Sequence, residues 1–293
     1  MSTEAVTAGG AKVLDGKKVA AELAETTRGY VQRIEAESGV KPCLVTVLVG
    51  DNPASITYTK MKRKRCEAVG MASRKVELPN DTTTQQLVDC IGELGGDASV
   101  HGILLQHPSP PQVDERAAFE AIPKVKDVDG VTLSSFAAMA FGLPGWHSAT
   151  PGGMVRLLDA YDLDVTGMHA VVIGRSAILG KPMAALLLER NATVTVCHSR
   201  TRDIADLVRT ADVVVAAVGR PEFVKGDWVN PGAIVLDAGY NEGNVGDADY
   251  EGCAARASWI TPVPGGVGPM TIATLIEQTA LAAGEQLGVT LDA

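Results

Sequence analysis

The stretch from His169 to Lys181 reads His-Ala-Val-Val-Ile-Gly-Arg-Ser-Ala-Ile-Leu-Gly-Lys, and it decides the fold class. Residues 169–173 are mostly apolar and β-branched, which predicts a strand. Gly174 permits a tight turn directly after that strand, and a helix is predicted over 181–190. A strand, a glycine turn and a helix in this order are typical of an α/β nucleotide-binding unit, because the free amides at a helix N-terminus attract phosphate.

The turn departs from the usual Gly-x-Gly-x-x-Gly pattern, because Ser176 takes the place of one glycine. We expect Gly174, Arg175 and Ser176 to contact a phosphate, with Arg175 adding charge and Ser176 adding a hydroxyl donor. By spacing alone this signal is weak, and a plain turn with a solvated arginine is the alternative.

The next predicted strand, 193–197, indicates which dinucleotide binds. It ends at His-Ser-Arg-Thr, so Ser199 and Arg200 stand where enzymes that prefer NAD commonly carry an acidic residue. A serine and an arginine accommodate the 2′-phosphate of NADP, which a carboxylate would repel. We therefore predict NADP as the cofactor. Gly219 and Tyr240 follow later strands and are expected near the same edge of the sheet.

The same alternation extends outward over most of the chain. Strands that alternate with helices predict parallel sheets with right-handed crossovers, and the pattern restarts near Ala149, so we predict an α/β fold with two domains. Helices are expected over residues 19–37, 58–69, 83–94, 151–160, 181–190, 202–210 and 270–285, and strands over 43–49, 73–78, 102–105, 169–173, 193–197, 213–217 and 233–237.

A loop rich in proline and glycine lies between a strand-like run and the last apolar helix. Pro262–Thr271 holds three prolines and three glycines, a composition that cannot form a helix or a central strand. A rigid loop with small side chains lets backbone approach a flat ligand closely, so Pro264, Gly265 and Gly266 are expected to bind substrate. A plain αβ connection is the alternative.

Composition excludes several classes of protein. The net charge of −9 argues against a nucleic-acid partner, and no apolar run has the length of a membrane span. Residues 1–10 lack a basic start and an apolar core, so we expect a frayed tail and a cytoplasmic protein. The five scattered cysteines, Cys43, Cys66, Cys90, Cys197 and Cys253, indicate neither a zinc site nor a disulfide framework.

Tyr58 and Lys62 stand four residues apart on a predicted helix and therefore share one face. On chemistry alone, an exposed lysine beside a half-buried tyrosine is the better reading. The surrounding basic residues most simply form a solvated helix face. They are Lys60, Lys62, Arg63, Lys64 and Arg65.

Five motifs occur together in this chain: Ser55-Ile-Thr-Tyr-Thr-Lys-Met-Lys62, Gly102-Ile-Leu-Leu-Gln106, Lys126-Asp-Val-Asp-Gly130, Gly174-Arg-Ser-Ala-Ile-Leu-Gly-Lys-Pro182 and the proline–glycine loop. In order and spacing they resemble the methylenetetrahydrofolate dehydrogenase/cyclohydrolase family, the folate enzymes called FolD. The resemblance covers roughly residues 12 to 282. It implies a folate-binding domain of residues 1–148 plus 271–293, onto which the last helix packs back, and a Rossmann-like NADP-binding domain of residues 149–270.

The resemblance also implies roles for individual residues. Tyr58 would stack on the aminobenzoate ring of the folate, and Lys62 would reach its one-carbon bridge. Gln106 would hold the lysine and, with burial, lower its pKa. Asp129 would accept the two neighbouring donors of the pterin, while Asp127 is assigned to structure; an ordinary Asp-x-Asp turn remains the alternative. The outward-facing basic residues of the helix would attract the anionic glutamate tail of a folate.

The implied activity is oxidation of 5,10-methylenetetrahydrofolate with NADP⁺, then hydrolysis of the methenyl product to 10-formyltetrahydrofolate, in a homodimer without metal. Four segments depart from the family pattern: His107–Pro110, Val131–Ser135, Ser148–Pro151 and Tyr240. The first three border the predicted folate site. A dehydrogenase that has lost the hydrolytic step is therefore one rival, and a non-catalytic NADP-binding sensor is the other.

Overall fold

The structure is a computed structural model, and it describes residues 5–291. Contacts between residues divide the chain into two compact units. Unit 1 holds the residues up to Ala20, Met139–Leu143 and Thr150–Thr271, and unit 2 holds Ala21–Ala138, Pro144–Ala149 and the residues from Ile272 onward. Every strand pair of the two sheets is parallel, as the alternating pattern predicts. No helix among the described residues is long and apolar enough to cross a membrane.

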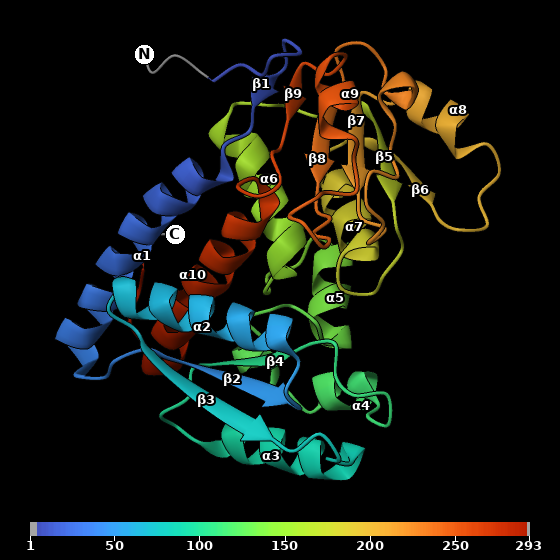
Figure 1. Cartoon of the computed structure of the whole chain (residues 1–293). Coiled ribbons are helices and arrows are strands. Elements are labelled where there is room, and N and C mark those ends of the chain that lie inside the picture. Colours follow the sequence, from blue (N-terminus) through green and yellow to red (C-terminus); the bar gives the residue numbers. More distant parts are fainter. Residues whose placement is uncertain (1–4, 292–293) are drawn as a thin grey trace. The chain divides into compact units, whose positions relative to one another are not determined.

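Unit 1 is built on a six-stranded sheet in the order β1-β9-β8-β7-β5-β6 (Figure 1). From β6 to β9 this is the doubly wound order in which the direction of strand addition reverses between β5 and β7. Ligands of such sheets bind at the carboxyl ends of the strands beside that reversal. The strands are β1 (Lys12–Val13), β5 (His169–Ile173), β6 (Thr193–Cys197), β7 (Val213–Ala216), β8 (Ile234–Asp237) and β9 (Trp259–Ile260).

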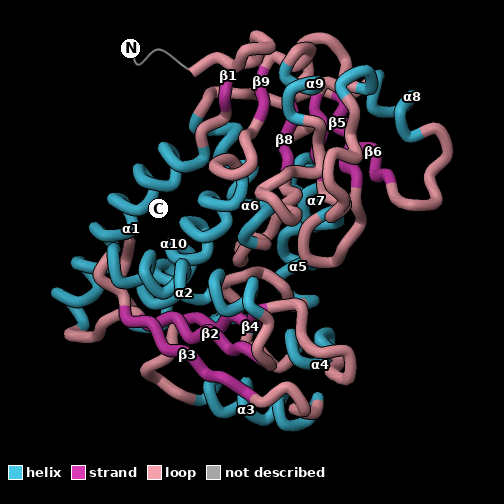
Figure 2. The backbone as a smooth tube through the Cα atoms, in the orientation of Figure 1, coloured by secondary structure: helices cyan, strands magenta, loops and turns pink. Residues whose placement is uncertain are grey.

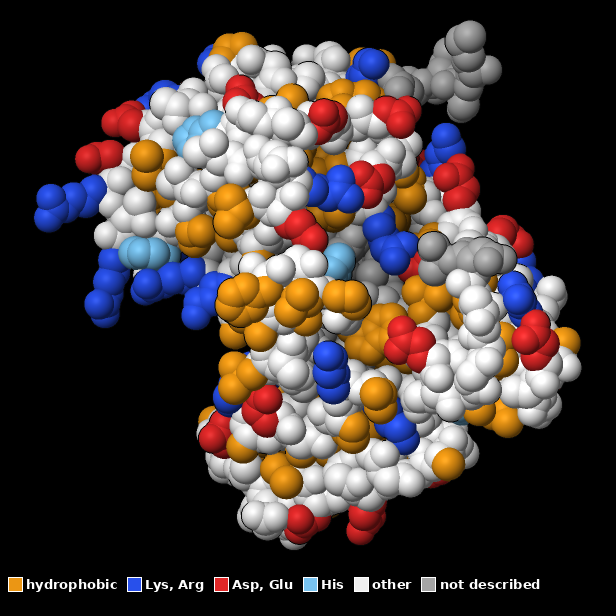
Figure 3. Space-filling view, turned by 180° about the vertical axis from the view of Figure 1, so that it is seen from behind, with side chains coloured by type: hydrophobic (Ala, Val, Ile, Leu, Met, Phe, Trp, Pro, Cys, Tyr) orange, Lys and Arg blue, Asp and Glu red, His pale blue; other side chains and the backbone are white. Residues whose placement is uncertain are grey.

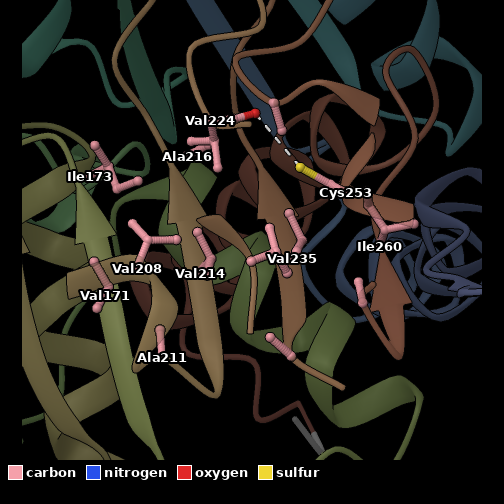
Figure 4. Packing of buried hydrophobic residues seen from close by; sticks show 14 of the residues in the cluster. Val171, Ile173, Val208, Ala211, Val214, Ala216, Val224, Val235, Cys253 and Ile260 are labelled. Carbon is pink, nitrogen blue, oxygen red and sulfur yellow. Dashed lines mark hydrogen bonds between the residues drawn. The ribbon is translucent and has the colours of Figure 1, made fainter. Parts of the chain in front are cut away.

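Small apolar side chains fill the core of unit 1 (Figure 4). Val171, Val214 and Val235 come from three adjacent strands and are fully buried. Cys253 lies at the same core, where its Sγ contacts the carbonyl oxygen of Val224 at 3.7 Å. The helical segments of this unit are α6 (Ala149–Ala160), α7 (Gly180–Glu189), α8 (Ile204–Arg209), η2 (Gly226–Trp228) and α9 (Tyr250–Ala254).

Unit 2 contains a three-stranded sheet in the order β3-β2-β4 (Figure 2). All seven residues of the central strand β2 are buried, as expected for a parallel strand covered on both faces. The strands are β2 (Cys43–Val49), β3 (Ala72–Leu78) and β4 (Gly102–Gln106). The helical segments that belong wholly or mostly to this unit are α1 (Gly16–Ser38), α2 (Pro53–Ala68), α3 (Thr84–Gly96), α4 (Glu115–Glu120), η1 (Lys124–Lys126), α5 (Leu133–Ala140) and α10 (Val267–Leu287).

The last helix packs into the core of unit 2, as the family resemblance implies. Leu275 and Ile276 of α10 belong to one buried cluster with Leu44 of β2 and Leu104 of β4. On the other side, α3 buries Leu87, Ile91 and Leu94. Its start is fixed by a capping box between Thr83 and Gln86, each of which satisfies a backbone N–H of the other.

Two predictions about local structure are wrong. Residues 5–10 are not frayed, because the chain turns at Gly10 and the amide of Val13 donates to the carbonyl of Ala5 at 2.8 Å; residues 1–4 lie outside the described part. The proline–glycine loop is also shorter than predicted, since α10 begins at Val267. Pro269 falls in its first turn, where a missing amide hydrogen does no harm.

Candidate active site

One face of α2 is buried and places Lys62 in the interior of unit 2. The helix begins at Pro53, where Asn52 accepts from the amide of Ser55 at 3.2 Å and acts as an N-cap. The buried positions follow helical spacing: Ser55, Thr59, Lys62, Cys66 and Val69. Lys62 is only 8% exposed, whereas the other basic residues of the predicted cluster, Lys60, Arg63, Lys64 and Arg65, are exposed.

A glutamine at the end of β4 holds the Lys62 amine. Nζ of Lys62 donates to Oε1 of Gln106 at 2.9 Å, and Nε2 of Gln106 donates to the carbonyl of His107 at 2.8 Å. The second bond fixes which end of the amide faces the lysine. Because a glutamine is neutral, it does not offset the cost of burying a positive charge, and burial lowers the pKa of Lys62. An amine in this state can accept a proton nearer to neutral pH.

Asp129 faces this amine but lacks a bonding partner. Its side chain keeps a modest exposed fraction, and its carboxylate makes no hydrogen bond or ion pair with any residue between 5 and 291. Burial raises the pKa of Asp129 to about 7, against the opposing attraction of Lys62. Asp129 in turn favours the charged form of Lys62 and partly offsets the fall in its pKa. The two side chains are therefore electrostatically coupled.

Asp127 has the opposite environment, although it lies only two residues away. It is completely buried, and it accepts from the amides of Val131 and Thr132 at 3.0 and 2.9 Å and from the hydroxyl of Ser135 at 2.6 Å. Its oxygens are thus used to hold the start of α5, in agreement with the predicted structural role. The contrast leaves Asp129 as the carboxylate that is available to a ligand.

Tyr58 lies one helical turn before Lys62 and is half-buried. Its ring is therefore on the same side of α2 as the amine. Lys62, Gln106 and Asp129 come from α2, from the end of β4 and from the loop after η1. The structure brings these three predicted residues together, with Tyr58 beside them.

The predicted phosphate turn joins β5 to α7 in unit 1. Gly174 has φ +133°, and a Cβ atom placed there would lie 2.2 Å from the carbonyl oxygen of Ala217. A Cβ atom on Gly180 would lie 2.2 Å from the carbonyl oxygen of Gly174. Only glycine fits either position, so the turn is tightly closed while Arg175 and Ser176 remain exposed at its tip. This geometry suits a phosphate held by backbone amides.

A second turn lies at the end of β6, next to β5 in the sheet. The amide of Arg200 donates to Nδ1 of His198 at 3.2 Å, and the amide of His198 donates to the hydroxyl of Thr201 at 2.9 Å. These bonds close the turn and leave Ser199 and Arg200 exposed. The residues present fit the 2′-phosphate of NADP, because the turn offers a cation and a hydroxyl.

The remaining predicted residues also belong to unit 1. Gly265 has φ +119°, and its carbonyl oxygen accepts from the amide of Lys17 at 3.0 Å; Gly265 and Gly266 are both buried, and Pro264 is exposed. Tyr240 is 56% exposed, and its hydroxyl donates to Asn244 at 2.6 Å. These residues are not part of the Lys62 cluster, which lies in unit 2.

Sequence reasoning missed Asp247, which is fully buried after β8 and bonds to several backbone amides. Its neighbours in sequence, Gly246 and Ala248, give no signal of this role. Asp237, at the end of β8, accepts from the amides of Gly239, Asp247 and Ala248.

A doubly wound sheet in which strand β5 leads through a closed glycine turn into a helix is the architecture of a dinucleotide-binding enzyme domain. Two family models match the chain: the tetrahydrofolate dehydrogenase/cyclohydrolase catalytic domain over residues 14–129, and the NAD(P)-binding domain of the same family over residues 148–287. The chain belongs to the tetrahydrofolate dehydrogenase/cyclohydrolase family.

Individual relatives agree with this assignment. The bifunctional protein FolD 1 of Streptomyces avermitilis is 61% identical over 279 residues, which cover 95% of this chain and 97% of the relative. The crystal structure of the bifunctional enzyme FolD from Campylobacter jejuni has a TM-score of 0.91 at 42% identity, covering 96% of this chain and 99% of that one. FolD of Trypanosoma brucei, solved with NADP cofactor and an inhibitor, has a TM-score of 0.90 at 35% identity, covering 94% and 97%.

Proposed function

We propose that Lys62, Gln106 and Asp129 form the reaction centre of a bifunctional folate enzyme, with Tyr58 beside them. The chain oxidises 5,10-methylenetetrahydrofolate to the methenyl form with NADP⁺ and hydrolyses that product to 10-formyltetrahydrofolate. The observation that supports the residue assignment is the pairing of a buried amine, held by a neutral glutamine, with a carboxylate that has no hydrogen-bonding partner among residues 5–291.

The first step needs the folate to be held with its one-carbon bridge in position for hydride transfer. When bound, NADP⁺ accepts that hydride. We assign Asp129 to the pterin, whose ring N–H and exocyclic amine form a donor pair that one carboxylate can accept. Tyr58 would stack on the aminobenzoate ring, and Pro264, Gly265 and Gly266 of unit 1 remain predicted ligand-contacting residues. These contacts position the substrate and add no redox chemistry.

The second step needs proton transfer to and from the groups bonded to the bridge carbon. Water attacks the methenyl carbon and a C–O bond forms; as the C–N bond to one folate nitrogen breaks, that nitrogen takes one proton, and the second proton of the water leaves to solvent with the positive charge of the methenyl cation, which completes the formyl C=O. Lys62 in its neutral form can accept the proton of the attacking water and return one to the leaving nitrogen. Gln106 supports this role because it fixes the amine without the charge that would keep it protonated.

In unit 1 we assign Gly174, Arg175 and Ser176 to the pyrophosphate of NADP, and Ser199 and Arg200 to its 2′-phosphate. Tyr240 follows β8 and would lie on the nicotinamide side. The closed glycine turn and the exposed arginine support this assignment. Unit 2 would then bind folate and unit 1 NADP.

We also propose a cytoplasmic homodimer that supplies one-carbon units for purine, methionine and histidine synthesis. All five cysteines are unpaired, which supports a reducing compartment.

Apolar side chains gather on part of the surface (Figure 3). Phe141 and Leu143 of unit 1 are 79% and 58% exposed, and burying such groups favours self-association. Sedimentation of the purified protein would detect a dimer or a monomer.

Both activities can be measured in one cuvette. NADPH and methenyltetrahydrofolate absorb at different wavelengths, so their formation and decay give the two rates separately. We expect NADPH formation, and methenyl decay faster than in buffer alone. Methenyl accumulation without accelerated decay would identify a dehydrogenase that has lost hydrolysis, and binding of NADP⁺ with neither reaction would identify a sensor.

A further inference from the structure

Asp247 is a buried carboxylate that the proposed chemistry does not use. Its Oδ2 accepts from the amides of Val218 and Gly219 at 2.6 and 2.8 Å. Its Oδ1 accepts from the amide of Arg220 at 2.9 Å and from Nδ2 of Asn241 at 3.0 Å. Three consecutive amides of the turn after β7 therefore point at one side chain, which is fully buried.

The same bonds determine where the carbonyl groups of that turn point. In a trans peptide the C=O is directed opposite to the N–H, so the carbonyl of Ala217 is turned away from Asp247. That carbonyl oxygen lies 2.2 Å from the place a Cβ of Gly174 would occupy, so it packs directly against the phosphate turn. By fixing the peptide between Ala217 and Val218, Asp247 thus also fixes the surface on which Gly174 rests.

Asp247 also anchors the loop after β8. Asn241, which donates to Asp247, also donates its backbone N–H to the carbonyl of Val245 at 2.8 Å. It begins the small hairpin that contains Asn244 and directly follows Tyr240. The backbone of Asp247 is itself held at the end of β8, because its amide donates to Oδ1 of Asp237 at 3.0 Å. One side chain therefore joins the carboxyl ends of β7 and β8 and supports the turn after β5.

We propose that Asp247 is a positioning residue for NADP, which fixes the turns at the carboxyl ends of β5, β7 and β8 in the geometry that binds the dinucleotide. Ligands of doubly wound sheets bind at these strand ends. The proposal rests on the assignment of NADP to unit 1. Asp247 does not touch the cofactor itself; it acts through Gly174 and the turn of residues 218–220.

Asparagine is the sharpest substitution, because it keeps the size of the side chain. Each oxygen of Asp247 accepts two N–H groups. An amide NH₂ accepts none, so Asp247→Asn loses two of the four bonds whichever way the amide is turned. Asn241→Ala is the milder variant, since it removes one of the four donors to Asp247, together with the bond of 3.2 Å from the same amide to the carbonyl of Val245. Asp249→Ala is the matched control: Asp249 caps α9 by accepting from Gly252 and makes no bond to either strand-end turn.

The test measures the dissociation constant of NADP⁺ by fluorescence titration, together with hydrogen exchange of the 218–220 amides and the rate of methenyl hydrolysis. For Asp247→Asn we expect the dissociation constant to rise about tenfold or more, with a smaller rise for Asn241→Ala. The 218–220 amides should exchange faster, and hydrolysis, which needs no hydride acceptor, should stay within about twofold of the unsubstituted rate. Asp249→Ala should leave NADP⁺ affinity unchanged.

Unchanged NADP⁺ affinity in Asp247→Asn would overturn the proposal. So would an equal loss of affinity in Asp249→Ala, or a parallel loss of affinity and hydrolysis, because these outcomes indicate a general loss of folding. If Asp247→Asn does not fold, Asn241→Ala decides, and an unchanged affinity in that variant refutes the role. Failure of the unsubstituted protein to bind NADP⁺ would instead refute the assignment of the cofactor to unit 1.

Discussion

Asp247 of unit 1 and Asp129 of unit 2 are both carboxylates largely shielded from solvent, but they differ in the number of N–H groups that the protein donates to them. Asp247 of unit 1 receives four N–H groups from the protein. Asp129 of unit 2 receives none from the described residues, and its pKa is raised to about 7 by burial. The first carboxylate shapes backbone, whereas the second is left for a ligand to complete. A shielded carboxylate that receives no hydrogen bonds lowers the stability of the folded protein, and residues that carry such a penalty are typical of functional sites.

The largest effect is expected from removing the amine beside Asp129. Lys62→Met keeps length and apolar stem, so we expect methenyl hydrolysis to fall by about 10²–10⁴, the usual loss of an acid–base group, and the dehydrogenase rate to fall less. The two-wavelength assay measures both rates. Lys64→Met is the matched control, because Lys64 is exposed on the same helix and should leave both rates unchanged. If Lys62→Met retains full hydrolysis, the amine has no catalytic role.

Removing the carboxylate tests the other half of the pair. Asp129→Ala should raise the KM for folate about ten- to a hundredfold, since a charged hydrogen-bonding partner contributes about 1.5–3 kcal/mol, and NADP⁺ affinity should be unaffected. Asp89→Ala, an exposed acid of α3, serves as control. An unchanged folate KM would show that Asp129 is a turn residue and that the comparison with Asp247 has no functional meaning.

Substitution at the predicted 2′-phosphate site of unit 1 should change the affinity for NADP⁺ but not for NAD⁺. Arg200→Gln is expected to weaken NADP⁺ by about 1.5–3 kcal/mol and to leave NAD⁺ nearly unchanged, because only NADP⁺ carries the 2′-phosphate. Binding titrations with both nucleotides measure this difference. Arg209→Gln removes an arginine that pairs with Asp206 elsewhere in unit 1 and should affect neither. Equal losses for NADP⁺ and NAD⁺ would place Arg200 away from the 2′-phosphate.

The smallest effect concerns stability. Because the pKa of Asp129 is about 7 in the folded protein and near 3.8 when unfolded, the folded state binds more protons between these values, and stability falls as pH rises through them. Asp129→Asn has no carboxyl group to ionise and therefore does not lose stability in this way. We expect its free energy of unfolding to be higher by about 1 kcal/mol at pH 8, and its Tm to exceed that of the unsubstituted protein by about 2–4 °C. The difference should be smaller at pH 5. A lower Tm at pH 8 would mean that the ionised carboxylate is stabilised in the fold.

The regular elements were predictable because their patterns are local. Strands 43–49, 169–173 and 193–197 were predicted with the bounds that the structure has. Short elements were missed: α4 and α5 contain six and eight residues, and β1 contains two. Their positions depend on tertiary partners, as when Asp127 holds the start of α5.

The site was predictable in part. Helical spacing places Tyr58 and Lys62 on one face, but it does not show which basic residue of α2 is buried, because burial depends on the elements that pack against the helix, such as the sheet that carries Gln106. The family resemblance supplied that choice. Neither source indicated Asp247, since a single aspartate in a loop has no sequence pattern, and its role follows only from the amides that the fold directs at it.

The central claim is that the substrate supplies the donors Asp129 lacks, and proton release on binding tests it most directly. Calorimetric titration with a folate at pH 6.5, in buffers of different ionisation enthalpy, counts the protons released. With a pKa of about 7, Asp129 is mostly protonated before binding and ionised after it, so we predict release of more than half a proton per site, absent in Asp129→Asn. Equal proton counts for both proteins would contradict the account.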